Sequence, residues 1–280
     1  MIYCVNGAFV PERLAKVSIV DHGFLYGDGF YDTMRTYSGV ILELPLHLDR
    51  IENYAIQMGI RLRWSRAQMA HWLSEIVRRN RLRDARVRLT ITRGENQYDF
   101  TTSKKPTLTI MCQHLRPNTR IARGISASTM KLQRLLPEVK TMSLISMVLA
   151  YRQAAKNGDF EVIFIGEGNH VREGAGSNVF AVKRGKIYTP GRHILAGLTR
   201  RRVIALARSL KIPVHTKEFT SAFLRSADEV FLTNGLWEIA PAVRLNGKRV
   251  GRGKVGPITA SLQDAYGRYV RRLTVSHHSE

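Results

Sequence analysis

Short strand-type runs alternate with amphipathic helical stretches along the 280 residues, and this alternation is the feature that most constrains the fold. "FEVIFIG" and "DEVFLTN" are typical of buried strands, whereas "PLHLDRIENYAIQMGI" repeats apolar residues at helical spacing with Pro45 in its first turn. Near the middle, "HLRPNTRIARG" is polar and has no period, which is typical of a linker. We therefore expect an α/β protein with two domains of mixed β-sheet and packed helices: a smaller domain over 1–115, a linker over 116–124 and a larger domain over 125–280.

Local signals refine this expectation. The pair Asn6-Gly7 between "MIYCV" and "AFV" predicts a β-hairpin. A helix is expected over 65–80, followed by strands near 85–93 and 106–113. A further helix after Lys140 should be capped by Ser143 and end at Asn157-Gly158. Its expected buried stripe is Leu144, Met147, Val148, Tyr151 and Ala155.

The formal net charge of +22 raises the hypothesis of a polyanion-binding protein, and "RRNRLRDARVRLTITR" is its local candidate. Those arginines alternate with apolar residues, as on the solvated side of a helix and a strand, and no recognisable nucleic-acid motif accompanies them. A solvated arginine-rich surface is the favoured interpretation. No apolar run approaches the roughly 18 residues of a membrane span. The N-terminus does not resemble a secretory signal, and Cys4 and Cys112 show no metal-type spacing, so we expect a cytoplasmic protein without a metal.

Lys140 in "LPEVKTMSLISMVLAY" opens a run with no further charge until Arg152. A lysine against apolar surroundings loses hydration, which favours its neutral, nucleophilic form. Such an amine can form a Schiff base with a carbonyl cofactor. The alternative is an ordinary lysine whose ammonium reaches the surface.

Four other features suggest what Lys140 could hold. Glu173 lies between a strand and a glycine-rich turn. Leu198-Thr199 opens a helix whose backbone amides can bind an anion. Asn234-Gly235 follows a buried strand in a turn that can present more amides, and Arg50 is a fixed cation beside an apolar helix face. Each could be an ordinary turn, cap or flank. Together they describe a phosphorylated aldehyde held by a lysine, with a carboxylate for a ring nitrogen.

The order of the motifs carries a family resemblance. "DHGFLYGDGFYDTMR", "HLDRIENYA", "VKTMSLISMVLAYRQAAKNGDFEVIFIGEGNHVREGAGSNVF", "ILAGLTRRRVI" and "DEVFLTNGLWEIAPAV" together resemble the class IV (fold type IV) pyridoxal-phosphate enzymes. That family comprises D-amino-acid aminotransferases, branched-chain aminotransferases and aminodeoxychorismate lyases. The resemblance runs nearly end to end and implies a pyridoxal 5′-phosphate cofactor, with the active site in an interdomain cleft.

The resemblance also implies residue roles. Lys140 matches the Schiff-base lysine that moves the substrate proton, and Glu173 matches the carboxylate that keeps the pyridine nitrogen protonated. Arg50 matches the phosphate-binding arginine. The remaining cofactor positions implied are Leu195 beside the ring, Leu198 and Thr199 at the helix start, and Asn234 and Gly235 in the later turn.

On the substrate side, Tyr31 matches a tyrosine of the D-amino-acid branch. That branch reads the substrate carboxylate with an arginine and a histidine two residues apart, where "ITRGENQYDF" offers Tyr98 and Phe100. The usual carboxylate trap is therefore absent or rebuilt, and Arg88 or Arg35 could replace it. The substrate-side positions expected are Tyr31, Arg35, Arg88, Tyr98 and Leu236.

The expected function is transfer of an amino group between an amino acid and a 2-oxo acid, in two half-reactions through Lys140. The run after Lys140 and "NGKRVGRGKVGP" resemble the D-amino-acid branch, and the branched-chain type stays open. An alternative is a lyase releasing pyruvate from aminodeoxychorismate, because "TNGLWEIAP" begins as in that branch. A nucleic-acid-binding protein on a degenerate enzyme scaffold is the alternative from another class. The resemblance also implies a homodimer.

Overall fold

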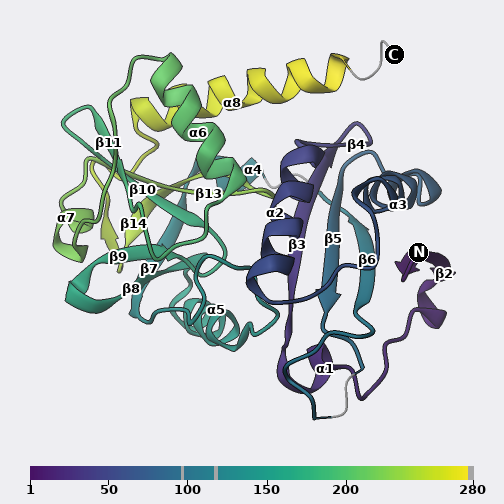
Figure 1. Cartoon of the computed structure of the whole chain (residues 1–280). Helices are drawn as coiled ribbons and strands as arrows, with labels where there is room; N and C mark the ends of the chain where they lie inside the picture. The colour runs from purple at the N-terminus through teal and green to yellow at the C-terminus, as the bar shows by residue number, and fades with distance from the viewer. Residues whose placement is uncertain (96–97, 117–118, 277–280) are drawn as a thin grey trace. The chain divides into compact units, whose positions relative to one another are not determined.

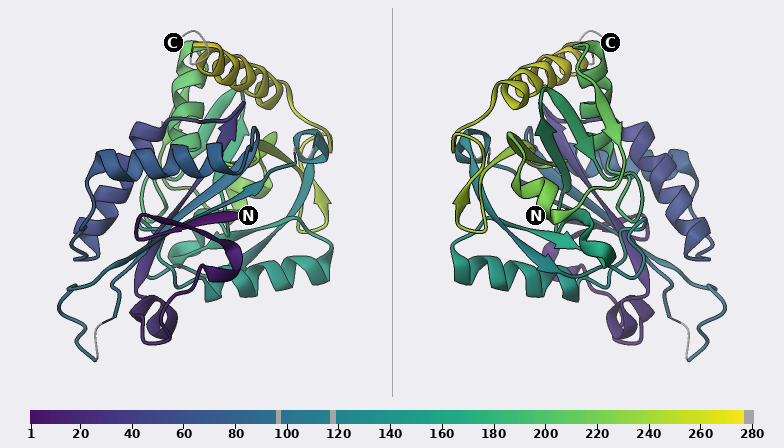
Figure 2. Two further views of the ribbon diagram at one scale, coloured as in Figure 1. Left: turned by 90° about the vertical axis from the view of Figure 1, so that its right-hand side faces the viewer. Right: turned by 90° about the vertical axis from the view of Figure 1, so that its left-hand side faces the viewer.

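The computed structural model describes residues 1–95, 98–116 and 119–276, which divide into two compact units (Figures 1 and 2). Unit 1 contains Met1–Arg116, Val139–Leu144 and Arg272–Glu280. Unit 2 contains Pro117–Glu138 and Ile145–Arg271. The segment around Lys140, which the sequence-based division assigns to the larger C-terminal domain, is thus grouped with the N-terminal unit.

The described strands of unit 1 form a six-stranded sheet in the order β2-β1-β6-β5-β3-β4. Every pairing in this sheet is antiparallel, so the expectation of a mixed sheet does not hold for this unit. Asn6 and Gly7 both have positive φ in the predicted hairpin turn. The strands are β1 (Ile2–Val5), β2 (Ala8–Pro11), β3 (Gly29–Tyr37), β4 (Val40–Ile41), β5 (Ala85–Thr92) and β6 (Thr107–His114).

Two helices, α2 (Leu44–Gln57) and α3 (Arg66–Arg79), cover one face of this sheet (Figure 1). Their apolar stripes pack on alternate residues of the central strands, among them Met34, Val87 and Cys112, which are fully buried. Ser65 begins α3 with a capping box, as its position before the helical run predicts. Unit 1 also contains the 3₁₀ turn η1 (Glu12–Leu14) and the short helix α1 (His22–Tyr26), where the glycines predicted only a loop.

A buried ion pair joins α2 to the sheet. Asp32 lies on the helix-covered face of β3 and is fully buried. Its carboxylate accepts hydrogen bonds from Arg50 Nε at 3.0 Å and Nη2 at 2.5 Å, and lies 3.1 Å from His47 Nδ1. Burial alone would raise the pKa of Asp32, but Arg50 and His47 hold that pKa well below its usual range. The pair therefore stabilises the fold at neutral pH, and this contribution is lost as the pH falls below the ordinary carboxyl range.

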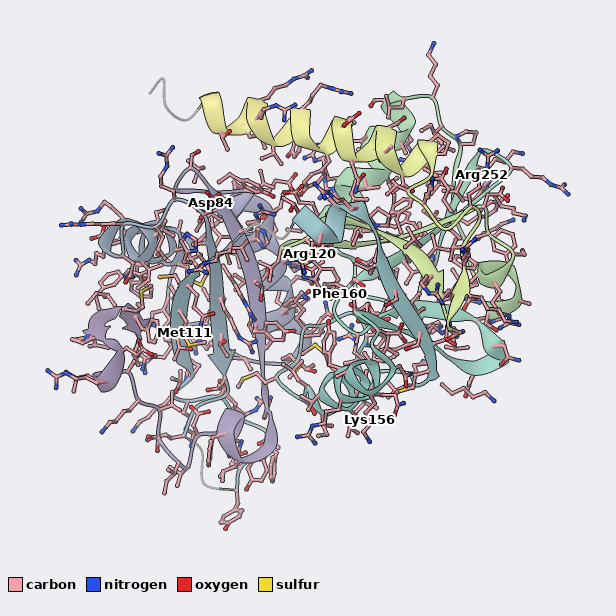
Figure 3. The ribbon with its side chains drawn as sticks, turned by 180° about the vertical axis from the view of Figure 1, so that it is seen from behind. Asp84, Met111, Arg120, Lys156, Phe160 and Arg252 are labelled. Atoms are coloured by element: carbon pink, nitrogen blue, oxygen red, sulfur yellow. The ribbon has the colours of Figure 1, made fainter. Side chains whose placement is uncertain are left out.

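The other face of the same sheet is polar. Tyr31, Thr33 and Arg35 of β3 point to it, and Thr33 pairs across the strands with Arg88. Arg88 pairs in turn with Met111 of β6, which is labelled in Figure 3 and is 37% exposed. Within unit 1, this face thus carries polar and cationic side chains where the opposite face carries the core.

Unit 2 is built on a mixed sheet, as expected. Its described strands follow the order β12-β11-β10-β13-β14-β7-β8-β9, with β15 paired to β14. The pairs β11–β12, β14–β7 and β7–β8 are parallel and the others antiparallel. The strands are β7 (Ile125–Lys131), β8 (Glu161–Ile165), β9 (Val171–Gly174), β10 (Asn178–Lys183), β11 (Lys186–Thr189), β12 (Val214–Thr216), β13 (Glu229–Asn234), β14 (Glu238–Leu245) and β15 (Lys248–Arg249).

The helical segments of unit 2 include one inside the predicted linker. This is α4 (Thr119–Arg123), whose Ile121 packs into the hydrophobic core of the unit. The linker prediction missed it because a five-residue helix has no measurable period. The other helical segments are α5 (Ile145–Asn157), η2 (Glu167–Asn169), α6 (Leu198–Ser209), α7 (Ser221–Arg225) and α8 (Pro257–Ser276), whose last residues are grouped with unit 1.

The helix α5 corrects two sequence predictions. It begins at Ile145, so Ser143 lies two residues before its first turn rather than at the cap. Its fully buried residues are Ala150 and Ala154, whereas the predicted stripe residues Val148 and Ala155 are exposed. The stripe is rotated because two alanines allow a close approach to Val162 and Phe164 of β8. The predicted end at Asn157 and Gly158 is confirmed. Within the described ranges, no helix has the length and hydropathy needed to cross a membrane.

Replacing Asp32 by Asn tests the buried ion pair. The change leaves the Arg50 guanidinium buried without its anion, and we expect the free energy of unfolding to fall by about 3 kcal/mol. Asp49→Asn on the same helix is the control, because Asp49 pairs with Arg66 at the surface and should contribute no more than about 1 kcal/mol. Thermal and urea unfolding at pH 7 measure both. Equal effects of the two changes would contradict the assignment.

Candidate active site

Lys140 is held against the edge of β3 by backbone pairing. Its carbonyl accepts a hydrogen bond from Tyr31 N at 2.9 Å, and Met142 N donates to Gly29 O at 2.9 Å. Thr141 forms an antiparallel bridge with Phe30 between them. The Lys140 side chain is half-buried, and its Nζ lies 5.3 Å from the centroid of the Tyr31 ring. Among the described residues, this nitrogen makes no hydrogen bond or ion pair, so the amine is held in place while its lone pair or protons stay available.

The Tyr31 ring brings Lys140 and Arg88 together. The guanidinium carbon of Arg88 lies 3.8 Å from the centroid of this ring, and Arg88 Nε donates to Thr90 Oγ1 at 3.2 Å. Burial lowers the pKa of Arg88; Tyr31 acts against this shift, and the charge of Arg86 adds to it. No carboxylate of the described residues pairs with Arg88. A half-buried guanidinium without a counter-ion is suited to an anionic ligand.

Arg35 lies farther along the same face. It is four residues beyond Tyr31 on β3, roughly 13 Å along the strand, and its guanidinium stacks 4.3 Å from the centroid of the Tyr37 ring. Arg35 and Arg86 are cross-strand partners, so their charges face the same side of the sheet. The structure thus places Arg88, rather than Arg35, beside Lys140 and Tyr31.

Arg50 lies behind β3, on the side of the sheet that α2 covers. Two of its three guanidinium nitrogens bind Asp32, and Nη2 also lies 3.4 Å from His47 Nδ1. Its third nitrogen, Nη1, makes no hydrogen bond within the described chain, so two N–H groups remain for an anion. Asp32 therefore aims the guanidinium as well as neutralising it.

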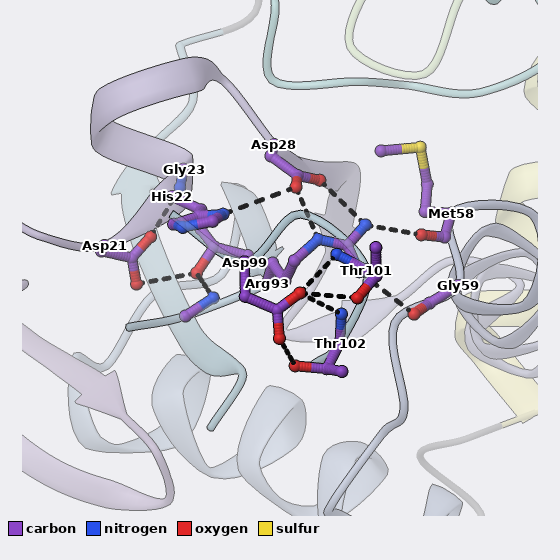
Figure 4. Close-up of polar contacts among 12 residues, drawn as sticks. Asp21, His22, Gly23, Asp28, Met58, Gly59, Arg93, Asp99, Thr101 and Thr102 are labelled. Carbon is purple, nitrogen blue, oxygen red and sulfur yellow. Dashed lines mark hydrogen bonds and ion pairs between the residues drawn. The ribbon is translucent and has the colours of Figure 1, made fainter. Parts of the chain in front are cut away.

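Tyr98 and Phe100 lie in the loop after β5, away from Lys140 in sequence and strongly exposed. Tyr98 is 86% exposed, and Phe100 contacts the rings of His22 and Tyr26. Figure 4 shows how Asp99 holds this loop through hydrogen bonds from Thr101 and Thr102. Within unit 1, Tyr98 makes no described contact with Tyr31 or Lys140, so the predicted role of Tyr98 gains no support from this chain alone.

In unit 2, Glu173 is 5% exposed and is fixed at both carboxylate oxygens. Its Oε1 pairs with Arg134 at 2.7 Å, and its Oε2 accepts a hydrogen bond from Leu195 N at 2.9 Å. Leu195 in turn is anchored by Asn178, whose Nδ2 donates to the Leu195 carbonyl at 2.8 Å. The structure therefore brings the two predicted residues Glu173 and Leu195 together and gives the carboxylate a single orientation.

Leu198 and Thr199 form the first turn of α6, as predicted. The N-cap of this twelve-residue helix is Gly197, and no side chain caps its amides. Gly197 fits closely here, because a Cβ on it would lie 2.1 Å from Asn178 Oδ1. The first amides of the helix and the Thr199 hydroxyl, which makes no described hydrogen bond, are suited to an anion.

Asn234 uses both ends of its side chain to shape backbone. Its Nδ2 donates to the Gly176 carbonyl, and its Oδ1 accepts from Leu236 N at 2.7 Å. The side chain thus joins the turn after Glu173 to the turn containing Gly235. Contacts from this second turn to a ligand would therefore come from its backbone amides rather than from the Asn234 side chain.

Sequence reasoning missed the partners that orient these residues. Asp32 could have been found, because it is a carboxylate between the buried Phe30 and Met34 on a period-2 strand. Arg134 gave no signal, because it lies 39 residues before Glu173 in an irregular segment. Partners that are distant in sequence cannot be read from local pattern.

Comparison with known proteins agrees with this geometry. The family model for class IV aminotransferases matches residues 29–245. A putative branched-chain-amino-acid aminotransferase of Methanocaldococcus jannaschii is 37% identical over 94% of this chain and 94% of its own length. A D-alanine aminotransferase of Staphylococcus haemolyticus is 33% identical over 95% of this chain and 96% of its own.

Solved structures give the same result. The branched-chain amino acid aminotransferase of Escherichia coli has a TM-score of 0.89 and 26% identity, covering 95% of this chain and 93% of its own. A thermophile's branched-chain aminotransferase, solved with pyridoxamine 5′-phosphate, has a TM-score of 0.91 at 26% identity, over 96% of this chain and 93% of its own. The enzyme of Thermoproteus uzoniensis with norvaline has a TM-score of 0.90 at 26% identity, over 96% of this chain and 94% of its own. On both sequence and fold, this chain belongs to the class IV aminotransferases.

Proposed function

We propose that this protein is a pyridoxal-phosphate-dependent aminotransferase that moves an amino group between an amino acid and a 2-oxo acid. The observation that carries the proposal is the Lys140 amine, held by backbone pairing beside Tyr31 and Arg88 and free of any described hydrogen bond. A nucleophilic amine beside an uncompensated cation is what a reaction on a carboxylate-bearing amine requires.

The residues of both units fit the cofactor chemically. Lys140 would hold its aldehyde, and Glu173 would hold the proton on its ring nitrogen, with Arg134 and Leu195 keeping that carboxylate in place. Leu195 would lie beside the ring. The phosphate would be held by Arg50 Nη1, the amides of Leu198 and Thr199, and the amide of Gly235.

When bound, pyridoxal phosphate supplies an electron sink for the electrons left at the substrate α-carbon. The chain's own residues do the rest. The Lys140 amine removes the proton from the α-carbon and later returns one to the cofactor's carbonyl carbon. Fixing Glu173 at two oxygens keeps its carboxylate available as an acceptor throughout, so the ring nitrogen stays protonated.

The substrate carboxylate is assigned to Arg88, with Tyr31 beside it and Arg35 farther along the face. This assignment rests on the half-burial of Arg88, its position over Tyr31 and the absence of a carboxylate partner in the described residues. Leu236 would line the same substrate. The assignment replaces the arginine–histidine pair at whose place this chain has Tyr98 and Phe100.

The relatives leave the D-amino-acid and branched-chain substrate types both open. The lyase alternative rests on "TNGLWEIAP" alone. We also propose a homodimer, as the exposed apolar side chains of unit 1 support. Ile19 is 75% and Phe24 67% exposed, and Tyr26 and Phe100 contact each other nearby. A cytoplasmic location is supported by two buried cysteines that are both free thiols.

A spectral titration tests the proposed reaction. The purified enzyme loaded with pyridoxal phosphate is mixed with one amino acid alone, over D- and L-alanine, leucine and glutamate. An aminotransferase converts the visible absorbance of the aldehyde form to that of the amine form, whereas a lyase releases pyruvate from aminodeoxychorismate and keeps the aldehyde form. Lys140→Ala should abolish both conversion and turnover. A variant that retained both would remove Lys140 from its role.

Replacing Arg88 by Gln tests the carboxylate assignment. Loss of a charge-assisted contact of about 2.7 kcal/mol lowers kcat/KM for amino acid and oxo acid roughly 100-fold. Arg86→Gln, two residues away on the same face, is the matched control and should change kcat/KM less than about threefold. Pyridoxal phosphate binding should be retained in both. If Arg86→Gln had the larger effect, the carboxylate would bind elsewhere on this face.

Light scattering tests the proposed dimer. The wild-type protein should have twice the mass of one chain. Phe24→Glu introduces a charge into the exposed apolar surface and should shift the protein towards the monomer. Ile56→Glu, at a site 79% exposed on α2, is the control and should leave the mass unchanged. A wild-type monomer at micromolar concentration would contradict the proposal.

A further inference from the structure

We propose that Glu161 is a positioning residue of this enzyme: its buried carboxylate holds the turn Gly174–Ser177 in place for cofactor binding and loosens that turn when it takes up a proton. The inference deepens the proposed function, because it rests on the assignment of Glu173 and the neighbouring turns to the cofactor. It concerns a residue that neither touches the reacting groups nor belongs to the predicted site.

Glu161 is the first residue of β8 and is fully buried. Its Oε1 accepts a hydrogen bond from Val162 N at 2.9 Å. Its Oε2 faces three donors: Ser177 Oγ at 3.1 Å, Gly176 N at 3.3 Å and Tyr151 Oη at 3.3 Å. Two of these donors belong to the turn, and the third comes from α5. One carboxylate oxygen thus ties the turn to the helix.

The turn has little freedom to rearrange around this oxygen. A Cβ on Gly174 would lie 2.1 Å from Ser177 Oγ, and one on Gly176 would lie 2.5 Å from Tyr151 Oη. On its other side the Gly176 carbonyl accepts from Asn234 Nδ2, whose own Oδ1 holds Leu236 N. The hydrogen bonds therefore run from Glu161 through the turn that follows Glu173 to the turn that contains Gly235.

The electrostatic surroundings of Glu161 differ from those of the buried carboxylates Asp32 and Glu173. The groups that face it are the Tyr151 phenol from α5, the Ser177 hydroxyl and two backbone amides, while its neighbour on β7 is Ala127. Within the described residues, no cation pairs with it. Burial raises the pKa of Glu161 to about 7, even though its four hydrogen bonds act to lower that pKa. The group therefore changes charge in the physiological range.

Protonation changes what Oε2 can accept. An ionised oxygen can accept from all three donors, whereas a protonated one has fewer lone pairs. The two hydroxyls can reverse their roles, but the Gly176 amide can only donate. Protonation thus weakens the contact with Gly176, and the turn between Glu173 and Asn234 loses one of its restraints. Affinity for the cofactor should fall as the pH falls through about 7.

The first measurement is the Kd of the full-length apo-protein for pyridoxal phosphate, by fluorescence titration from pH 5.5 to 8.5. Loss of one hydrogen bond corresponds to an increase of about 3- to 10-fold in Kd between pH 8 and pH 6. Glu161→Gln cannot ionise, so this component should disappear. Glu229→Gln is the matched control, because Glu229 is a buried glutamate of the same unit that accepts from Thr259 N and Thr259 Oγ1. It should keep the wild-type pH dependence.

The second measurement does not involve the cofactor. A carboxyl whose folded pKa is raised loses stability as the pH rises from its ordinary value, 4.5, to about 7. The melting temperature of the apo-protein should carry this decline in the wild type and in Glu229→Gln. In Glu161→Gln the decline should be absent. If Glu161→Gln does not fold, Ser177→Ala replaces it, and removal of one donor should move the midpoint of the Kd profile to higher pH.

The outcomes separate the two proposals. A wild-type protein that binds no pyridoxal phosphate at any pH overturns the proposed function and this inference with it. If binding occurs but the Kd profile of Glu161→Gln or Ser177→Ala matches the wild type, only the positioning role of Glu161 is overturned. A lost pH dependence of melting with an unchanged Kd profile also overturns it, because Glu161 would then titrate without affecting the turn.

Discussion

The backbone pairing of Val139–Met142 with the start of β3 is the interaction on which the proposed chemistry depends. It places a segment from the middle of the chain against a strand of the N-terminal unit, so that Lys140 rises beside Tyr31. Gly29 makes the approach possible, because a Cβ there would lie 2.5 Å from Ile91 O and 2.9 Å from Met142 Sδ. Main-chain hydrogen bonds fix the amine without using the amine, which leaves it free to react.

Buried charges in this protein are oriented in two different ways. Asp32 and Glu173 each accept from an arginine, Arg50 and Arg134 respectively, and these pairs keep the carboxylates ionised and aimed. Glu161 has only neutral donors around it. The first arrangement gives a fixed charge over a wide pH range, and the second gives a group that can gain or lose a proton near neutrality. Each acts on a segment or side chain assigned to the cofactor.

The excess of cations acquires a partial physical meaning from the sheet of unit 1. Arg35, Arg86 and Arg88 lie on the polar face of one antiparallel sheet, where the run "RRNRLRDARVRLTITR" first suggested a nucleic-acid surface. The strand pairing turns two arginines of that run, Arg86 and Arg88, to the side of Tyr31. For them, a small carboxylate is a better-matched ligand than a polyanion, because Arg88 is half-buried over an aromatic ring.

The sequence by itself determined the family, the helix and strand segments with strong period, and the residues that local motifs carry, such as Lys140, Glu173 and Thr199. Periodicity and turn chemistry act over a few residues, so they are legible in the chain. Only the tertiary structure decided that β3 pairs with the Lys140 segment, that α5 buries two alanines, and that Asp32, Arg134 and Glu161 orient or restrain the site. The arginine partners of Asp32 and Glu173 are brought to them by packing across 18 and 39 residues, and no local pattern encodes a contact over such a separation.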